Sequence, residues 1–272
     1  MEINLLLPIS LFMMTALPVL IYKGVAEKSK KIFENKKISV LEAIFIVAFI
    51  GLLVIIINFI PSYAIQILFI TALSYNLFIF THLFSRRVVV SIVPPIIFTA
   101  SFLILNFLLM ENILAVILIT DIFSVTFAII AVTLISPLFS WRVMIIFASL
   151  LAIMDFIHVF ITGSMVEAAG KVVSLSLPLI LLLPSISSLK KLTILGLGDI
   201  FLSGLLSTHV ASRYNSKAGL LTAFSISIVF LIYDVIASNF ILHLRAFPAT
   251  ILVLSGFLMG MSPYIFKKRK RT

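Results

Sequence analysis

Residues 143–162 read VMIIFASLLAIMDFIHVFIT, a stretch in which Asp155 is the only acidic or basic residue besides His158. A run of about 20 mainly apolar residues has the length of a helix that crosses the hydrocarbon core of a bilayer. Similar runs recur along the 272-residue chain, which is 62% hydrophobic and 11% charged, with a mean hydropathy of +1.29. Soluble domains are roughly 45–50% apolar and 25% charged. The composition therefore excludes a water-soluble globule and predicts an all-α, polytopic membrane protein.

The apolar runs are bounded by charges, prolines or polar clusters and predict nine membrane-crossing helices. They lie near residues 3–22, 41–60, 63–84, 88–109, 113–138, 143–162, 192–212, 218–242 and 247–266. A tenth run, 172–188, contains Pro178, Pro184 and several serines. Because proline interrupts helices, we expect a re-entrant or extended segment there.

The chain has no evident repeat or linker, so we expect residues 1–272 to form one membrane domain. Residues 1–142 would hold helices one to five, and residues 143–272 would hold helices six to nine, in which the candidate catalytic residues lie. The first helix is followed by lysines rather than a small-residue cleavage site, which favours a retained helix over a signal peptide.

The positions of the basic residues predict the orientation. With nine helices and a cytosolic C-terminus, the segments outside the cytosol contain only four of the 20 Lys and Arg residues: Lys171, Lys190, Lys191 and Arg245. Cytosolic connections carry an excess of Lys and Arg, so we expect the N-terminus outside and the C-terminus in the cytosol. The net charge of +10 is spread over many connections, which argues against a nucleic-acid partner and leaves the lipid bilayer as the surrounding partner.

The residue types exclude several kinds of chemistry. The chain has no cysteine, so it forms no disulfide and has no thiol nucleophile. Its four histidines are scattered, and no His-Glu-x-x-His segment occurs. We therefore expect no metal and no other cofactor.

Four aspartates lie inside the predicted helices: Asp121, Asp155, Asp199 and Asp234. A charged side chain at mid-membrane costs about 2.5–3.5 kcal/mol on insertion scales and persists mainly where it faces a bundle interior or a watery cavity. Intramembrane acids are therefore candidate functional residues.

Asp155 and Asp199 are distinguished from the other two by their surroundings. Asp199 ends the segment Gly196-Leu197-Gly198-Asp199, in which two glycines let another backbone approach closely. If the helices expected at 143–162 and 192–212 run antiparallel, the two carboxyl groups lie at the same depth. Two such acids can share a proton, one acting as a base toward water and the other as an acid toward a peptide carbonyl.

Three segments carry a resemblance to a known family. Asp155, the Gly196-Leu197-Gly198-Asp199 segment and Phe247-Pro248-Ala249-Thr250 resemble, in order and in context, the Tyr-Asp, Gly-x-Gly-Asp and Pro-Ala-Leu motifs of presenilin and signal peptide peptidase. The spacing of the two acids and the orientation deduced above resemble the signal peptide peptidase and archaeal presenilin-homologue branch. Two positions depart from the family pattern: Met154 replaces its tyrosine, and Thr250 replaces its leucine.

The resemblance implies an intramembrane aspartyl endopeptidase that cuts transmembrane helices such as signal-peptide remnants. It implies a catalytic pair, Asp155 and Asp199, and no cofactor. It also implies a substrate site formed by Gly196, Leu197, Gly198, Pro248, Ala249 and Thr250. The protein would be a multi-pass component of the cell membrane in a prokaryote or of the endoplasmic reticulum in a eukaryote; its oligomeric state stays open.

Two other functions remain as alternatives. Prepilin and preflagellin peptidases also use Gly-x-Gly-Asp, but they cut at the cytosolic face, whereas this segment is predicted to lie toward the outside. A proton-coupled transporter would use the four aspartates as a relay. Tyr233-Asp234 imitates Tyr-Asp but follows Gly-x-Gly-Asp in the chain, so we expect Asp234 to pair with Arg245 or a neighbouring helix. We expect a structural role for Asp121 as well.

Overall fold

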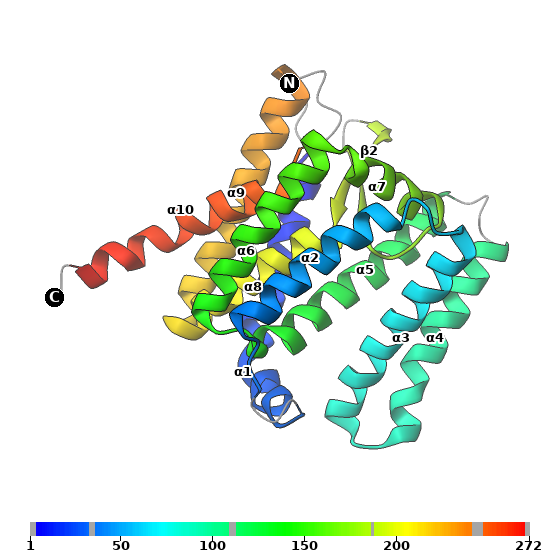
Figure 1. Cartoon of the computed structure of the whole chain (residues 1–272), viewed down its shortest axis with the longest axis horizontal. Coiled ribbons are helices and arrows are strands. Elements are labelled where there is room, and N and C mark those ends of the chain that lie inside the picture. Colours follow the sequence, from blue (N-terminus) through cyan, green and yellow to red (C-terminus); the bar gives the residue numbers. More distant parts are fainter. Residues whose placement is uncertain (1–3, 33–35, 109–112, 186–187, 241–246, 270–272) are drawn as a thin grey trace.

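The computed structural model describes residues 4–32, 36–108, 113–185, 188–240 and 247–269, and these are mainly helical (Figure 1). The helices are α1 (Leu6–Ile32), α2 (Val40–Ile56), α3 (Ser62–Ser85), α4 (Val88–Leu108), α5 (Ile113–Ile135), α6 (Trp141–Phe156), α7 (Ser164–Ser174), α8 (Leu197–Arg213), α9 (Ser216–Phe240) and α10 (Ala249–Arg269). A short 3-10 helix, η1 (Ser136–Leu138), follows α5, and a π-helical turn, η2 (Ile157–Ile161), continues α6. The strands β1 (Ile180–Ser185) and β2 (Ser188–Gly196) form an antiparallel hairpin.

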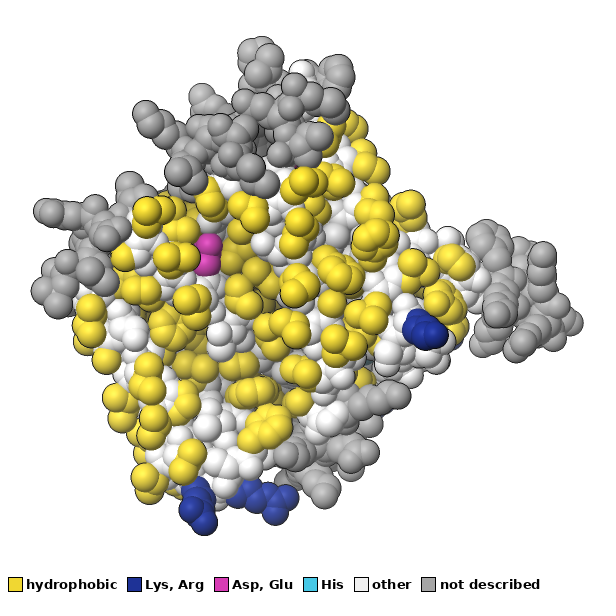
Figure 2. All heavy atoms as spheres, turned by 180° about the vertical axis from the view of Figure 1, so that it is seen from behind, with side chains coloured by type: hydrophobic (Ala, Val, Ile, Leu, Met, Phe, Trp, Pro, Cys, Tyr) yellow, Lys and Arg dark blue, Asp and Glu magenta, His cyan; other side chains and the backbone are white. Residues whose placement is uncertain are grey.

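Several helices are suited to cross a membrane. In the described part of the chain, five are long and apolar enough: Ser62–Ser85, Val88–Asn106, Leu114–Leu138, Trp141–Ile161 and Ser216–Ala237. Three shorter helices are also apolar: Leu6–Tyr22, Val40–Ile56 and Ala249–Tyr264. Figure 2 shows a face on which hydrophobic side chains predominate, with an acidic side chain among them and basic ones toward its edges. The all-α, multi-pass membrane fold is confirmed in this form, while the count of nine crossings and the orientation stay predictions.

Helix α8 lies at the centre of the bundle (Figure 1). It contacts α1, α5, α6, α9 and α10, and its residues Leu202, Leu205, Leu206 and Val210 are fully buried. The functional interest of this position is that the first turn of α8 contains Asp199.

Glycines set the closest approach between α9 and α10. A Cβ atom at Gly256 would lie 2.4 Å from Cα of Ile226, and one at Gly260 would lie 2.6 Å from Cα of Thr222. In membranes, where helices gain little from burying apolar surface, such small residues allow close backbone packing. This packing holds α10, which begins beside Asp155.

The structure corrects two predicted helix boundaries, the start of α8 and the end of α1. The helix expected at 192–212 begins only at Leu197, because residues 188–196 form β2. A short apolar run does not distinguish a strand from a helix, and here pairing with β1 decides. The extended segment expected within 172–188 is confirmed by β1, although its first three residues complete α7. Helix α1 also continues to Ile32, through part of what was expected to be a connection.

Candidate active site

Asp155 lies in the last turn of α6 and is bonded to the beginning of α10. Its Oδ2 atom accepts a hydrogen bond of 3.2 Å from the Thr250 backbone N–H and one of 2.7 Å from the Thr250 hydroxyl. The first N–H groups of a helix have no partner within the helix, and they favour a negatively charged acceptor. Asp155 therefore supplies an acceptor for the N-terminus of α10.

Asp199 lies in the first turn of α8, directly after β2. Its carboxylate accepts a hydrogen bond from the backbone N–H of Gly196. It also lies near enough to Asp155 for the charges of the two carboxyl groups to interact. The two acids that the sequence pairs are therefore brought together. They do not meet within two antiparallel helices over 143–162 and 192–212, because residues 188–196 form β2 and the hairpin positions Asp199.

The two glycines before Asp199 have different surroundings. A Cβ atom at Gly196 would lie 3.0 Å from Oδ2 of Asp199, so the carboxylate uses the space that a side chain would fill. At Gly198, a Cβ atom would meet no described atom within 4 Å. Gly196 thus accommodates the acid itself, and Gly198 leaves a surface beside it open.

Asp121 on α5 is bonded to the hairpin rather than to the carboxyl pair. Its Oδ1 atom accepts a hydrogen bond of 2.9 Å from the backbone N–H of Leu182 on β1. One turn further along α5, the Ser124 hydroxyl donates a hydrogen bond of 2.7 Å to the carbonyl of Ile180. The contribution of Ser124 has no signal in the sequence.

Asp234 on α9 is buried and contacts the N-terminal segment. It accepts a hydrogen bond of 3.2 Å from the backbone N–H of Asn4, and the Asn4 side chain donates one of 3.1 Å to the Thr193 hydroxyl on β2. The expected partner Arg245 lies outside the described residues. The observed partner is Asn4, which lies just before α1. No local sequence pattern predicts a contact between two residues that are 230 positions apart.

The family model described as signal peptide peptidase matches residues 5–266. The chain belongs to the signal peptide peptidase family. No curated protein matches the chain.

Membership of the signal peptide peptidase family makes this chain a protease-family member that acts within membranes. The match includes the first five helices, where the sequence alone resembles the family only in hydropathy. It does not favour the prepilin-type peptidase or the transporter.

The two departures from the signal peptide peptidase pattern have different contacts. Thr250, in place of leucine, uses its hydroxyl to bond Asp155. Met154, in place of tyrosine, lies against Gly51 of α2. The first substitution therefore adds a polar contact to a candidate catalytic acid, and the second brings an apolar side chain to the α2–α6 interface.

His158 is a further residue near the acids, and the sequence suggests only a packing or interfacial role for it. It lies in the π-helical turn after α6, close enough to Asp155 for the two side chains to interact electrostatically. Its Nδ1 atom lies 2.8 Å from the Ser164 hydroxyl, while Nε2 is buried with no partner among the described residues. Asp155 and His158 are three residues apart in the sequence, a spacing that places two side chains close together on one helix. This spacing is the signal by which the sequence could have indicated their proximity.

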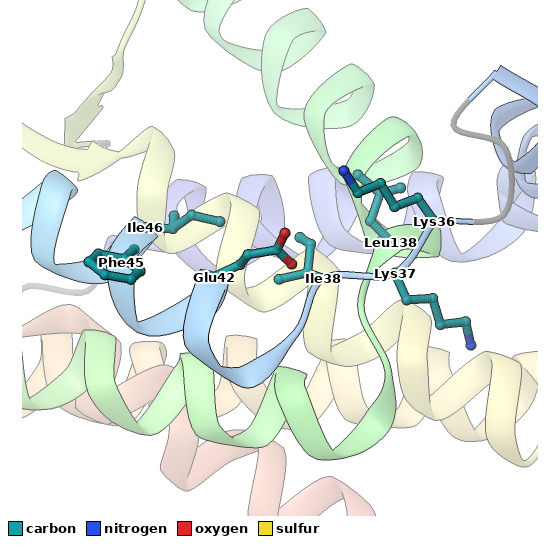
Figure 3. A pocket seen from close by; sticks show the side chains of 7 residues that line it. All are labelled: Lys36, Lys37, Ile38, Glu42, Phe45, Ile46 and Leu138. Carbon is teal, nitrogen blue, oxygen red and sulfur yellow. The ribbon is translucent and has the colours of Figure 1, made fainter.

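A cavity of about 380 Å³ lies away from the acids, near the start of α2 (Figure 3). It is lined by Lys36, Lys37, Ile38, Glu42, Phe45, Ile46 and Leu138. Leu138 precedes α6, so the cavity is roughly 20 Å along that helix from Asp155 at 1.5 Å per residue. In Figure 3 the two lysines point apart, and the Glu42 carboxylate bonds the Ser39 backbone. This cavity is therefore separate from the candidate active site.

Proposed function

We propose that the chain is an intramembrane aspartyl endopeptidase in which Asp155 and Asp199 form the catalytic pair. The observation that carries the proposal is the interaction of these two carboxyl groups between α6 and α8, beside an extended hairpin. Two neighbouring carboxyl groups do not readily ionise together, so one is expected to hold a proton while the other is ionised.

Such a pair performs peptide hydrolysis in two steps. The ionised carboxyl takes a proton from water as the water oxygen bonds to the peptide carbon, and the protonated carboxyl donates its proton to the carbonyl oxygen. The resulting gem-diol collapses, its C–N bond breaks, and a proton passes to the leaving nitrogen. No metal or redox partner is needed to balance these steps.

The substrate that we propose is a transmembrane helix, such as a signal-peptide remnant. A peptide bond inside a helix is protected by the helix's hydrogen bonds and side chains, so the segment must unwind before it is cut. Gly196, Leu197 and Gly198 would contact the unwound segment on one side of the pair, and Pro248, Ala249 and Thr250 on the other.

The edge of β2 offers a backbone partner for the unwound segment. Leu182 is opposite Ile194 in the hairpin, and the Leu182 N–H is directed to Asp121. In an antiparallel pair of this kind, the N–H and C=O groups of both residues face away from the other strand. The backbone of Ile194 is therefore directed to the outer edge of β2, where an extended peptide could add as a strand.

The direct test is incubation of the purified chain with a labelled transmembrane peptide, followed by identification of new termini by mass spectrometry. Cleavage that Asp199→Ala removes would support the proposal. Proton-driven solute uptake into vesicles without peptide cleavage would support a transporter instead.

We expect Thr250→Val to lower kcat/KM about tenfold, because it removes a hydroxyl bonded to a carboxylate, a contact worth roughly 1.5–3 kcal/mol. Thr250→Ser is the matched control, since it keeps the hydroxyl and the backbone N–H. Steady-state cleavage of the labelled peptide measures both. Equal rates for the two variants would show that the hydroxyl does not position Asp155.

We propose nine crossings with the N-terminus outside, which predicts the accessibility of introduced cysteines. A cysteine at Ser176, between α7 and β1, should react with an impermeant maleimide on intact cells, and one at Ser29 should not. The native chain contains no cysteine, so there is no background labelling. Labelling at Ser29 alone would show that the orientation is the opposite of the one proposed. The expected preference for substrates with a cytosolic N-terminus would then be reversed as well.

A further inference from the structure

The outer edge of β1 is covered by α5. Ile180, Leu182 and Pro184 alternate along this edge and are opposite Gly196, Ile194 and Leu192 of β2. Ser124 bonds the carbonyl of Ile180, and Asp121 accepts the N–H of Leu182. Pro184 has no N–H to offer.

The register of the hairpin supports this assignment independently. The N–H of Leu197 donates to the carbonyl of Leu179 at 2.8 Å, so this pair is joined by hydrogen bonding across the hairpin. Counting by twos along each strand then makes residues 180, 182 and 184 the outward-facing ones. Two of these residues, Ile180 and Leu182, are the ones that bond the side chains of Ser124 and Asp121 on α5.

The opposite edge, formed by β2, is open beside the acids. The backbone of Ile194 faces outward, the residue is 48% exposed, and among the described residues no hydrogen bond joins its backbone to a group outside the hairpin. Two residues later, the outward N–H of Gly196 is bonded to Asp199. The hairpin thus has one covered edge and one open edge, and the open edge leads to the carboxyl pair.

We infer that Asp121, together with Ser124, is a positioning residue that closes the β1 edge and holds the hairpin in one register. The inference rests on the proposed function. An unwound substrate can then pair only with the β2 edge of the hairpin. Because the hairpin keeps a single register, one particular peptide bond of the substrate is placed at Asp155 and Asp199. A strand slipped by one residue would present the opposite set of side chains and backbone groups.

A carboxylate on α5 suits this role physically. A backbone N–H left without a partner in apolar surroundings is costly, and a charged acceptor makes a stronger hydrogen bond than a neutral one. Asp121 satisfies the Leu182 N–H and also occupies the edge that a second peptide would otherwise use. This gives the acid on α5 a role outside the proposed catalytic pair.

The first test measures hydrogen exchange of the full-length protein in detergent micelles. In Asp121→Leu, the amides of residues 180–183 and 185 should exchange about tenfold faster or more, because an ion-assisted hydrogen bond is lost. Asp121→Asn keeps an oxygen acceptor without the charge and should exchange more slowly than Asp121→Leu, at a rate nearer to that of the wild type. Thr126→Val on the same helix is the matched control, since its hydroxyl bonds only the α5 carbonyl of Ile122.

The second test reads the cleavage positions in a labelled transmembrane peptide by mass spectrometry. Asp121→Leu should cut at additional neighbouring bonds and lose about tenfold in kcat/KM, whereas Asp121→Asn should restore the wild-type pattern. A general loss of stability would lower the rate without spreading the cleavage positions. If Asp121→Leu does not fold, Ser124→Ala takes its place; it removes the Ile180 contact together with the local bond of the Ser124 hydroxyl to the Thr120 carbonyl on the same helix.

Unchanged exchange in residues 180–185 and an unchanged cleavage pattern in Asp121→Leu would overturn the inference. An Asp121→Asn variant that behaves like Asp121→Leu would also overturn it, since acceptance of the Leu182 N–H would then not be the cause. If the wild type cuts no transmembrane peptide, the proposed function fails, while the exchange measurement still decides whether Asp121 holds β1.

Discussion

Replacing either Asp155 or Asp199 by asparagine is expected to reduce peptide cleavage about a thousandfold or more, because general acid–base catalysis contributes about 10²–10⁴-fold and an amide cannot exchange the proton. Both variants should fold. In Asp155→Asn the amide oxygen can still accept from Thr250, and in Asp199→Asn it can still accept from the Gly196 N–H. Single-turnover cleavage of a labelled transmembrane peptide, with gel filtration as the check on folding, measures this effect.

Asp234→Asn is the matched control for the catalytic pair. Asp234 is also a buried intramembrane acid, but it bonds the Asn4 backbone, and asparagine keeps an acceptor for that N–H. This variant should retain most of the wild-type turnover. Near-normal turnover in Asp155→Asn or Asp199→Asn would refute the assignment of the pair, and equal losses in all three variants would favour a relay of acids.

Gly196→Ala is expected to have the next largest effect, a fall in kcat of about ten- to a hundredfold. The new methyl group would lie 3.0 Å from Oδ2 of Asp199, so either the carboxylate or the end of β2 must shift, which alters the placement of Asp199 relative to Asp155. Overpacking of this kind costs typically about 1–3 kcal/mol, which corresponds to a rate change of this size when it falls on a reacting group.

Gly198→Ala separates crowding of the acid from crowding of the substrate. A methyl group there meets no described atom within 4 Å, so we expect folding and kcat to be maintained. If an extended substrate passes over this surface, KM should rise. Steady-state kinetics of the two alanine variants therefore gives a kcat effect at Gly196 and a KM effect at Gly198, and the reverse assignment would contradict the geometry.

Local sequence was sufficient for the membrane helices and for the candidate catalytic acids. Apolar runs such as 63–84 and 88–109 correspond closely to α3 and α4, because helix formation in a membrane depends on continuous local hydropathy. The acids were recognised because an ionisable side chain inside such a run is rarely retained without a role. The glycines before Asp199 identified which acid allows a close approach.

Contacts between distant segments could not be predicted in the same way. The run 192–196 is apolar and was assigned to a helix, yet it forms β2 because residues 180–184 lie opposite it. The partner of Asp155 is Thr250, 95 residues away, and the partner of Asp234 is Asn4, 230 residues away. Thr250 belongs to a segment that the sequence singles out, but nothing in that segment indicates a bond to Asp155, and Asn4 has no distinguishing local pattern.

The sequence by itself therefore determined a helical, multi-pass membrane protein of the signal peptide peptidase family, with its candidate acids on two named segments. The tertiary structure alone decided that a hairpin precedes Asp199, that Thr250 bonds Asp155, and that Asp121 covers the edge of β1. The physical reason is that a membrane helix forms wherever about one helix length of consecutive residues is apolar, which can be read from the local sequence. The partner of a polar group in the membrane interior depends instead on how whole helices pack against one another.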